Sequence, residues 1–89
     1  MLSKYEVYPE EFSNVLTINM IAQVPGNFII ALEDIKTSKI FRMVGAEVKE
    51  GANTVQFEEL QDLPASEYLV TIQHNEGDEV YKSFLRKNK

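Results

Sequence analysis

Residues 63–87, LPASEYLVTIQHNEGDEVYKSFLRK, decide the fold class of this chain. Two apolar-rich runs flank the polar segment NEGD at residues 75–78. In the first run Tyr68, Val70 and Ile72 share one face and alternate with Leu69, Thr71 and Gln73, which is the period of a β-strand. The second run alternates less regularly, yet the stretch as a whole predicts a β-hairpin.

The rest of the chain repeats this pattern of short strands and turns. Turn signals recur about every ten residues, which favours a sandwich or a small barrel over a helical fold. Gly45 lies in the middle of one long run and predicts a bulge or a bend there. Further strands are predicted at residues 14–24, 28–35, 39–49 and 54–60, a weaker one at 4–9, and turns at 25–27, 34–39 and 50–53. We therefore predict an all-β, antiparallel, immunoglobulin-like β-sandwich of about seven strands.

Length and composition agree with one small domain over residues 1–89. A chain of 89 residues that is 44% hydrophobic can build one core. It contains no cysteine, so packing and β-ladders must stabilise the fold without a disulfide.

The net charge of −5 excludes the cationic footprint that nucleic-acid binding requires, so we expect no nucleic-acid partner. An anionic membrane surface would repel the chain for the same reason. No run approaches the ~20 apolar residues of a transmembrane helix. The first twelve residues, MLSKYEVYPEEF, also lack the apolar segment of a secretory signal peptide.

Candidate chemical sites are few, and each has a simpler interpretation. His74 is the single histidine, and with no cysteine it offers no metal-ligand cluster, so we expect an exposed surface histidine. The acidic stretch 74–79 lacks the spacing of a calcium loop and is expected to be a solvated turn. Adjacent carboxylates point to opposite faces of a strand, so we expect exposed side chains rather than an acid–base pair at Glu10–Glu11, Glu33–Asp34 and Glu58–Glu59.

No phosphate-binding, dinucleotide-binding or nucleophile-elbow motif is present in the sequence. A sandwich of this size also has little room for a substrate cavity. We therefore expect no enzyme activity, no catalytic or metal-binding residues, no cofactor and no small-molecule substrate. Among the tyrosines, Tyr68 is expected in the core with its hydroxyl at the rim, while Tyr8 and Tyr81 fit either the core or a binding surface.

The order of several short motifs resembles a known family. VYP at residues 7–9 precedes a strand reading NVLTIN, and EGANTVQF, LPASEYLVTIQ and EVYKSFLRK follow in that order. This order resembles the C-terminal sorting domain, type A, of the Bacteroidetes type IX secretion system, across residues 7–87. The sequence departs from the family pattern in three places. YPEE replaces YPNP, Ser66 stands where the family has glycine, and DIKTSK lacks the glycine of the family's turn, so another turn type is needed there.

The resemblance implies a sorting and secretion signal that forms the C-terminal module of a larger cargo protein. Its partners would be the outer-membrane secretion machinery and a sortase-like peptidase. Its location would be the cell surface or the exterior, reached through the periplasm and outer membrane. By resemblance, recognition would fall on Leu63, Pro64, Ala65, Tyr68, Lys82, Leu85, Arg86 and Lys87.

A terminal edge strand with a basic end suits docking by strand addition, and it also permits a weak edge-strand dimer. The simpler interpretation of the same residues is that Tyr68 and Leu85 are core residues and that the lysines keep the edge soluble. An immunoglobulin-like extracellular binding or adhesion module is the alternative function. It predicts an exposed aromatic or apolar patch on one sheet.

Overall fold

The computed structural model describes residues 2–77 and 79–88, which form eight β-strands and no helix. The period-two alternation seen in the sequence accounts for these strands, because it lets each strand bury one face. The strands are β1 (Leu2–Tyr8), β2 (Glu11–Phe12), β3 (Leu16–Ala22), β4 (Gly26–Asp34), β5 (Ile40–Val48), β6 (Gly51–Phe57), β7 (Ser66–His74) and β8 (Val80–Lys87).

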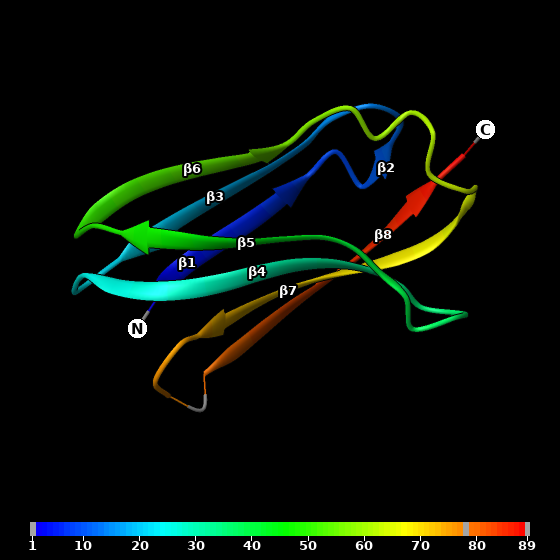
Figure 1. Cartoon of the computed structure of the whole chain (residues 1–89). Helices are drawn as coiled ribbons and strands as arrows, with labels where there is room; N and C mark the ends of the chain where they lie inside the picture. The colour runs from blue at the N-terminus through cyan, green and yellow to red at the C-terminus, as the bar shows by residue number, and fades with distance from the viewer. Residues whose placement is uncertain (1, 78, 89) are drawn as a thin grey trace.

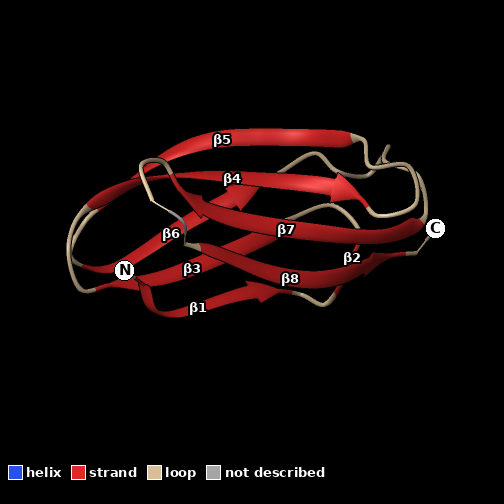
Figure 2. Ribbon diagram, turned by 90° about the horizontal axis from the view of Figure 1, so that it is seen from below, coloured by secondary structure: helices blue, strands red, loops and turns tan. Residues whose placement is uncertain are grey.

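The strands form two facing sheets, which are visible as separate layers in Figures 1 and 2. One sheet has the order β1-β3-β6, and the other has the order β2-β8-β7-β4-β5. Neighbouring strands are antiparallel except β2 and β8, which run parallel. The chain therefore changes sheets between β1 and β2.

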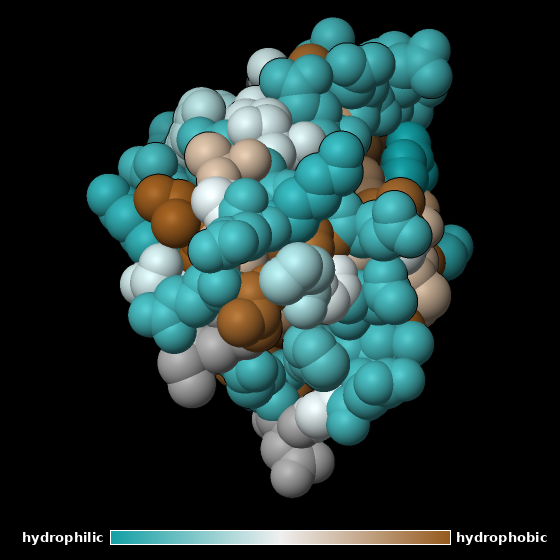
Figure 3. Space-filling model, turned by 90° about the vertical axis from the view of Figure 1, so that its left-hand side faces the viewer, coloured by the Kyte–Doolittle hydropathy of each residue, from teal (hydrophilic) through white to brown (hydrophobic). Residues whose placement is uncertain are grey.

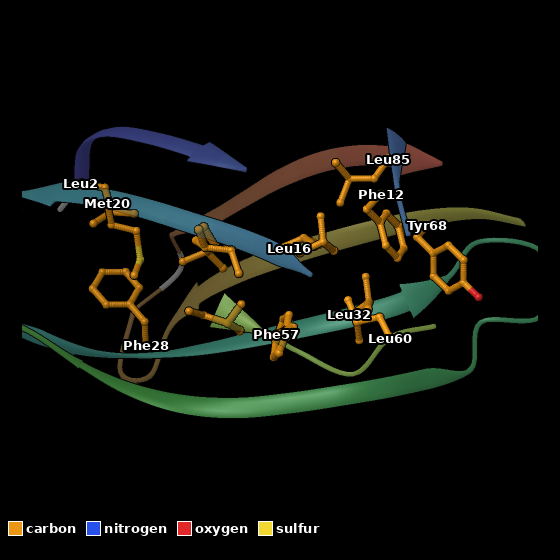
Figure 4. Packing of buried hydrophobic residues seen from close by; sticks show 14 of the residues in the cluster. Leu2, Phe12, Leu16, Met20, Phe28, Leu32, Phe57, Leu60, Tyr68 and Leu85 are labelled. Carbon is orange, nitrogen blue, oxygen red and sulfur yellow. The ribbon is translucent and has the colours of Figure 1, made fainter. Parts of the chain in front are cut away.

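The core fills the space between the two sheets. Phe28 packs below Met20 and Leu2 at one end, and Phe12 lies beside Tyr68 and Leu85 at the other (Figure 4). The inward positions of β3, β4 and β7 are almost completely buried, as the alternation in β3 and β7 predicts: Leu16, Ile18, Met20, Phe28, Ile30, Leu32, Tyr68, Val70 and Ile72. The end of the molecule that carries the β3–β4 and β5–β6 turns is mostly hydrophilic (Figure 3). The main apolar burial is thus between the sheets.

The predicted all-β sandwich is confirmed at the level of two packed sheets, but the count of about seven strands is wrong. The eighth strand, β2, has two residues, which is too short for a period to be read from sequence. The turn predicted at residues 50–53 is also wrong, because β6 begins at Gly51 and Asn53 already pairs with Met20. Gly51 takes a φ of 101°, a conformation that suits glycine.

The bulge predicted at Gly45 is wrong as well. Gly45 pairs regularly with Ile29, and the register shift of this strand pair lies between Leu32 and Glu33. On β5 the shift falls between Arg42 and Ile40, so Phe41 is the extra residue. Phe41 packs against the core, which gives the bulge a packing role.

Candidate recognition surface

The residues predicted for recognition lie on the β7–β8 hairpin and on the loop before it. The hairpin register places Tyr68 opposite Leu85 on the inner face, and Glu67 opposite Arg86 on the outer face. Successive side chains point to opposite faces, so the eight predicted residues separate into a buried set and an exposed set.

Four of the eight residues are buried: Leu63, Tyr68, Leu85 and Lys87. Tyr68, fully buried, meets Phe12 edge-on with ring centroids 5.5 Å apart. Leu63 closes the end of the sandwich from the β6–β7 loop together with Leu60. In the isolated fold, the apolar members of this set are core residues and are not available to a partner.

Lys87 corrects the expectation of a free basic end to the last strand. Its side chain is 6% exposed, and its Nζ donates a 3.3 Å hydrogen bond to the carbonyl of Gln61. The stem packs at the inner face, since Lys87 has the same parity as Leu85. Lys87 therefore holds the β6–β7 loop against β8.

The other four predicted residues, Pro64, Ala65, Lys82 and Arg86, are exposed. Lys82 and Arg86 flank Phe84 on the outer face of β8, and Phe84 is 65% exposed. We call Lys82, Phe84 and Arg86 the β8 stripe. Arg86 approaches Glu67 to 3.7 Å, and because both side chains are largely exposed this pair contributes little to stability.

The edge of β8 is only partly open, because β2 pairs with its last residues. The amide of Arg86 donates to the carbonyl of Glu10 at 2.9 Å, so the backbone of Arg86 faces away from β7. Backbone direction alternates along a strand, and Phe84, Lys82 and Val80 therefore face the same way. The carbonyl of Lys82 accepts a 3.3 Å hydrogen bond from the Tyr5 hydroxyl. Within the described residues no strand pairs with Phe84 on this side.

A hollow of about 400 Å³ lies where β2, β8 and the end of β4 meet. Ile35, Phe84 and Leu85 supply its apolar lining, and Arg86 contributes one positive charge. Glu10, Glu11 and Glu67 make its remaining charges negative. The hollow fits a partner segment that carries an apolar side chain next to a basic group.

The approach to β7 is held by a corner of hydrogen bonds. The Tyr68 hydroxyl donates to the carbonyl of Pro64 at 2.6 Å. Burial, and then the nearby Asp34 carboxylate, raise the pKa of Tyr68. Ser66 Oγ donates to Asp34 Oδ1 at 3.1 Å, and Asp34 is 5% exposed. The expectation of an exposed carboxylate at Asp34 is therefore wrong: this side chain is a structural acceptor.

The opposite end of the hairpin is tied to β1 by two tyrosines. The Tyr81 hydroxyl donates to Glu79 and accepts a 3.2 Å hydrogen bond from the amide of Leu2. The ring of Tyr5 packs against that of Tyr81 at a tilt of 55°, with ring centroids 5.0 Å apart. Burial and the bond to Glu79 raise the pKa of Tyr81, and the same bond lowers the pKa of Glu79. Tyr81 thus joins the two sheets on this side. Tyr8, the other tyrosine whose location the sequence left open, is exposed.

His74 is half-buried rather than exposed, which corrects the sequence-based expectation. Its ring meets Phe28 at 88° with centroids 5.0 Å apart, and its Nδ1 accepts a 3.2 Å hydrogen bond from the amide of Glu76. No group of three or more metal-ligating side chains occurs within the part of the chain that the structure describes. His74 therefore has a packing role in the β7–β8 turn. Asp78, the last residue of the predicted 75–78 turn, lies outside the described residues.

Phe84 is the member of the surface that the sequence-based prediction missed. The signal was present, because Phe84 shares a face with Val80 in a strand whose other face carries Leu85. Which face points outward depends on the opposite sheet, and the sequence does not supply that information.

The amino-acid sequence matches no protein-family model and no curated protein. No helix in residues 2–77 and 79–88 has the length and apolar character needed to span a bilayer.

Proposed function

We propose that this chain is a non-catalytic, immunoglobulin-like C-terminal sorting domain that directs a larger protein across the outer membrane to the cell surface. The motif resemblance across residues 7–87 is the starting point for this proposal. The role contains no chemical step and requires a surface that a receptor recognises.

Two structural features support the immunoglobulin-like part of the proposal. The hydroxyl of Tyr68, near the start of β7, bonds back to Pro64, which is the arrangement of the tyrosine corner in immunoglobulin-like sandwiches. The chain also contributes β1 to one sheet and β2 to the other. The LPASEY segment thus has a structural reason for its tyrosine.

The observation that carries the sorting proposal is the β8 stripe beside a half-open strand edge. Lys82 and Arg86 are exposed, Phe84 between them is 65% exposed, and its backbone faces the unpaired side of β8. A receptor strand added there gains main-chain hydrogen bonds from the edge and side-chain contacts from the stripe. The proposed recognition set therefore becomes Pro64, Ala65, Lys82, Phe84 and Arg86.

The alternative, an extracellular binding or adhesion module, is favoured by the apolar content of the same face. Phe84, Val80 and Met43 are exposed on the outer side of the five-stranded sheet. Such a module would bind its target while remaining attached to the mature protein. Cleavage distinguishes the two functions, because a sorting domain is removed from its exported cargo whereas a binding module stays attached.

The test is export of a reporter that carries a signal peptide and residues 2–89, in a bacterium with a working type IX system. Lys82→Glu with Arg86→Glu should leave the reporter in the periplasm. The matched control is Lys4→Glu with Lys49→Glu, which makes the same charge change at exposed positions away from the stripe and should preserve export. Deletion of residues 85–89 is a poor test, because it removes Leu85 and Lys87 from buried positions.

Three results would contradict the proposal. The first is periplasmic retention of the unmodified fusion equal to that of a reporter without the domain. The second is equal export of the two charge-reversed pairs. The third is export without removal of the domain, accompanied by binding of cells or matrix, which would favour the adhesion module.

A further inference from the structure

Strand β5 is the outermost strand of the five-stranded sheet, and within the described residues no strand pairs with it on the side away from β4. It is nine residues long and contains neither lysine nor proline. Those residues commonly protect edge strands against pairing with another chain. The charged residues of β5 are Arg42 and Glu47, whereas the edge strand β1 carries Lys4 and Glu6.

The direction of the β5 backbone follows from the hydrogen bonds of β4. Odd-numbered residues of β4 face β7, since the carbonyl of Asn27 accepts from the amide of Asn75 and the amide of Ile35 donates to Glu67. Even-numbered residues of β4 therefore face β5, where Phe28 pairs with Ala46 and Ile30 with Val44. The backbone groups that point away from the sheet belong to Met43, Gly45 and Glu47. We call these three residues the β5 edge.

Both ends of the β5 edge are capped by side chains of the same molecule. The carbonyl of Phe41 accepts a 2.9 Å hydrogen bond from Arg42, whose guanidinium also reaches the carbonyl of Glu59. At the other end, Asn53 bonds both the amide and the carbonyl of Lys49, at 3.0 and 2.8 Å. An added strand therefore finds open backbone groups at Met43, Gly45 and Glu47.

Apart from the exposed Glu47, the side chains around this opening are apolar or absent. Met43 is 60% exposed, and Val44 and Ile40 are also exposed. Gly45 lies at the centre, and no atom comes within 4 Å of the position its Cβ would take. A hollow lies over the β4–β5 pair, lined by Gly45, Ala46, Glu47, residues 27–29 and Asn75.

We propose that the β5 edge is a self-association site, where a second copy of this chain adds its own β5 antiparallel about a two-fold axis at Gly45. Gly45 then faces Gly45 of the other copy, and Met43 faces Glu47. Each copy contributes all three residues of its edge, and the two sandwiches share one continuous sheet.

The register of this pair follows from the caps. A shift of the axis toward Val44 places Glu47 opposite Phe41, whose carbonyl is already bonded to Arg42. A shift toward Ala46 places Met43 opposite Lys49, whose amide and carbonyl are already bonded to Asn53. The register centred on Gly45 joins every open residue to an open residue.

Charge and shape are compatible with the same register. Arg42 falls opposite Val48, so no like charges face each other across the pair. The two glycines leave a gap on the outer face, and each exposed Met43 lies diagonally across from the other copy's glycine and can fill it. The β8 edge is less suited to self-pairing, because an axis at Lys82 would place two lysines in opposition.

The site is separate from the β8 stripe, so it does not depend on the proposed sorting function. The net charge of −5 makes two copies repel at long range, and added salt should strengthen their association. The small paired area predicts a weak dimer, with a Kd on the order of 0.1–1 mM.

Sedimentation equilibrium of residues 1–89 up to about 1 mM tests the proposal. We expect a monomer–dimer equilibrium that Gly45→Pro weakens by at least about tenfold. The proline removes an amide that faces away from β4, so the sheet itself keeps its hydrogen bonds. Met43→Glu is a second variant that leaves the backbone unchanged. It places a like charge opposite Glu47 of the other copy and should also give a monomer. Lys82→Pro is the matched control on the β8 edge and should still dimerise.

The proposal is overturned if the unmodified chain remains monomeric at about 1 mM. Persistence of the dimer in folded Met43→Glu overturns it too, and so does loss of the dimer in folded Lys82→Pro alone. Amide exchange at Gly45 supplies an independent readout. Its protection should rise with protein concentration, and concentration-independent exchange at this amide would contradict the pairing.

Discussion

Ser66 and Asp34, 32 residues apart in sequence, are joined by a 3.1 Å hydrogen bond from Ser66 Oγ to Asp34 Oδ1. The same Asp34 oxygen accepts the amide of Lys36 at 2.8 Å. Ser38 takes a φ of 61° in this turn, so the turn reverses without glycine. Two of the three places where the sequence departs from the sorting-domain motifs, Ser66 and the 34–39 turn, are therefore in direct contact.

Ser66→Ala should lower the free energy of unfolding by about 1–3 kcal/mol, because it removes a donor from a buried carboxylate. Urea denaturation checks this, with Ser13→Ala at an exposed position as the control. The loss should shrink when Asp34 is already alanine, since the two residues share one interaction. Strictly additive losses would argue against the bond.

Tyr68→Phe should cost about 0.5–1.5 kcal/mol, because it deletes the 2.6 Å hydrogen bond to Pro64 and keeps the buried ring. Thermal or urea unfolding measures the change. Tyr8→Phe is the matched control, since its hydroxyl is on the surface and bonds Asn19. Similar losses in both variants would contradict a special role for the corner.

Gly26→Ala should destabilise the fold by about 1–3 kcal/mol through overpacking. A Cβ at this position would lie 3.0 Å from Nε2 of His74, whose ring also packs on Phe28. Gly45→Ala is the control, since its Cβ would meet nothing within 4 Å. His74→Ala should relieve most of the cost of Gly26→Ala, and an unchanged cost in that background would exclude this contact as the cause.

The raised pKa values of Tyr68 and Tyr81 predict loss of stability at alkaline pH. Both tyrosines keep their protons more tightly in the fold than in the unfolded chain, where the pKa is 10.0. Their contribution is therefore complete below about pH 10 and falls as the pH rises through the folded values.

Urea midpoints measured from neutral to alkaline pH should decrease above about pH 10. The decrease should be smaller in Tyr68→Phe with Tyr81→Phe, which has no proton to lose at these positions. An identical alkaline decrease in this double variant would assign the effect to other groups.

Much of the sandwich is predictable from local pattern. In the strand predicted at residues 14–24, Leu16, Ile18 and Met20 alternate with polar Thr17 and Asn19, and the structure buries all three apolar side chains. The same argument worked for Tyr68, Val70 and Ile72. These successes share one cause, since side chains on a strand alternate whatever the strand pairs with.

The predictions that were wrong concern residues whose burial or pairing depends on segments elsewhere in the chain. Asp34 is buried because Ser66 supplies a donor, and Lys87 is buried because Gln61 supplies an acceptor. The two-residue β2 exists because β8 offers it a partner. Gly45 pairs regularly because the bulge is placed at Phe41, where an aromatic ring reaches the core.

The sequence by itself determined that this protein is an all-β chain with short strands, a hydrophobic inner face and a net negative charge. Periodicity and composition are local properties, so they can be determined from the sequence without knowledge of strand order. The tertiary structure decided which edges stay open. Pairing of β2 with β8 closes the end of one edge, while the caps from Arg42 and Asn53 leave Met43, Gly45 and Glu47 open on β5. The β2–β8 pairing joins segments far apart in the chain, and the caps form only once β5 has its register and its turn into β6, so neither follows from local pattern.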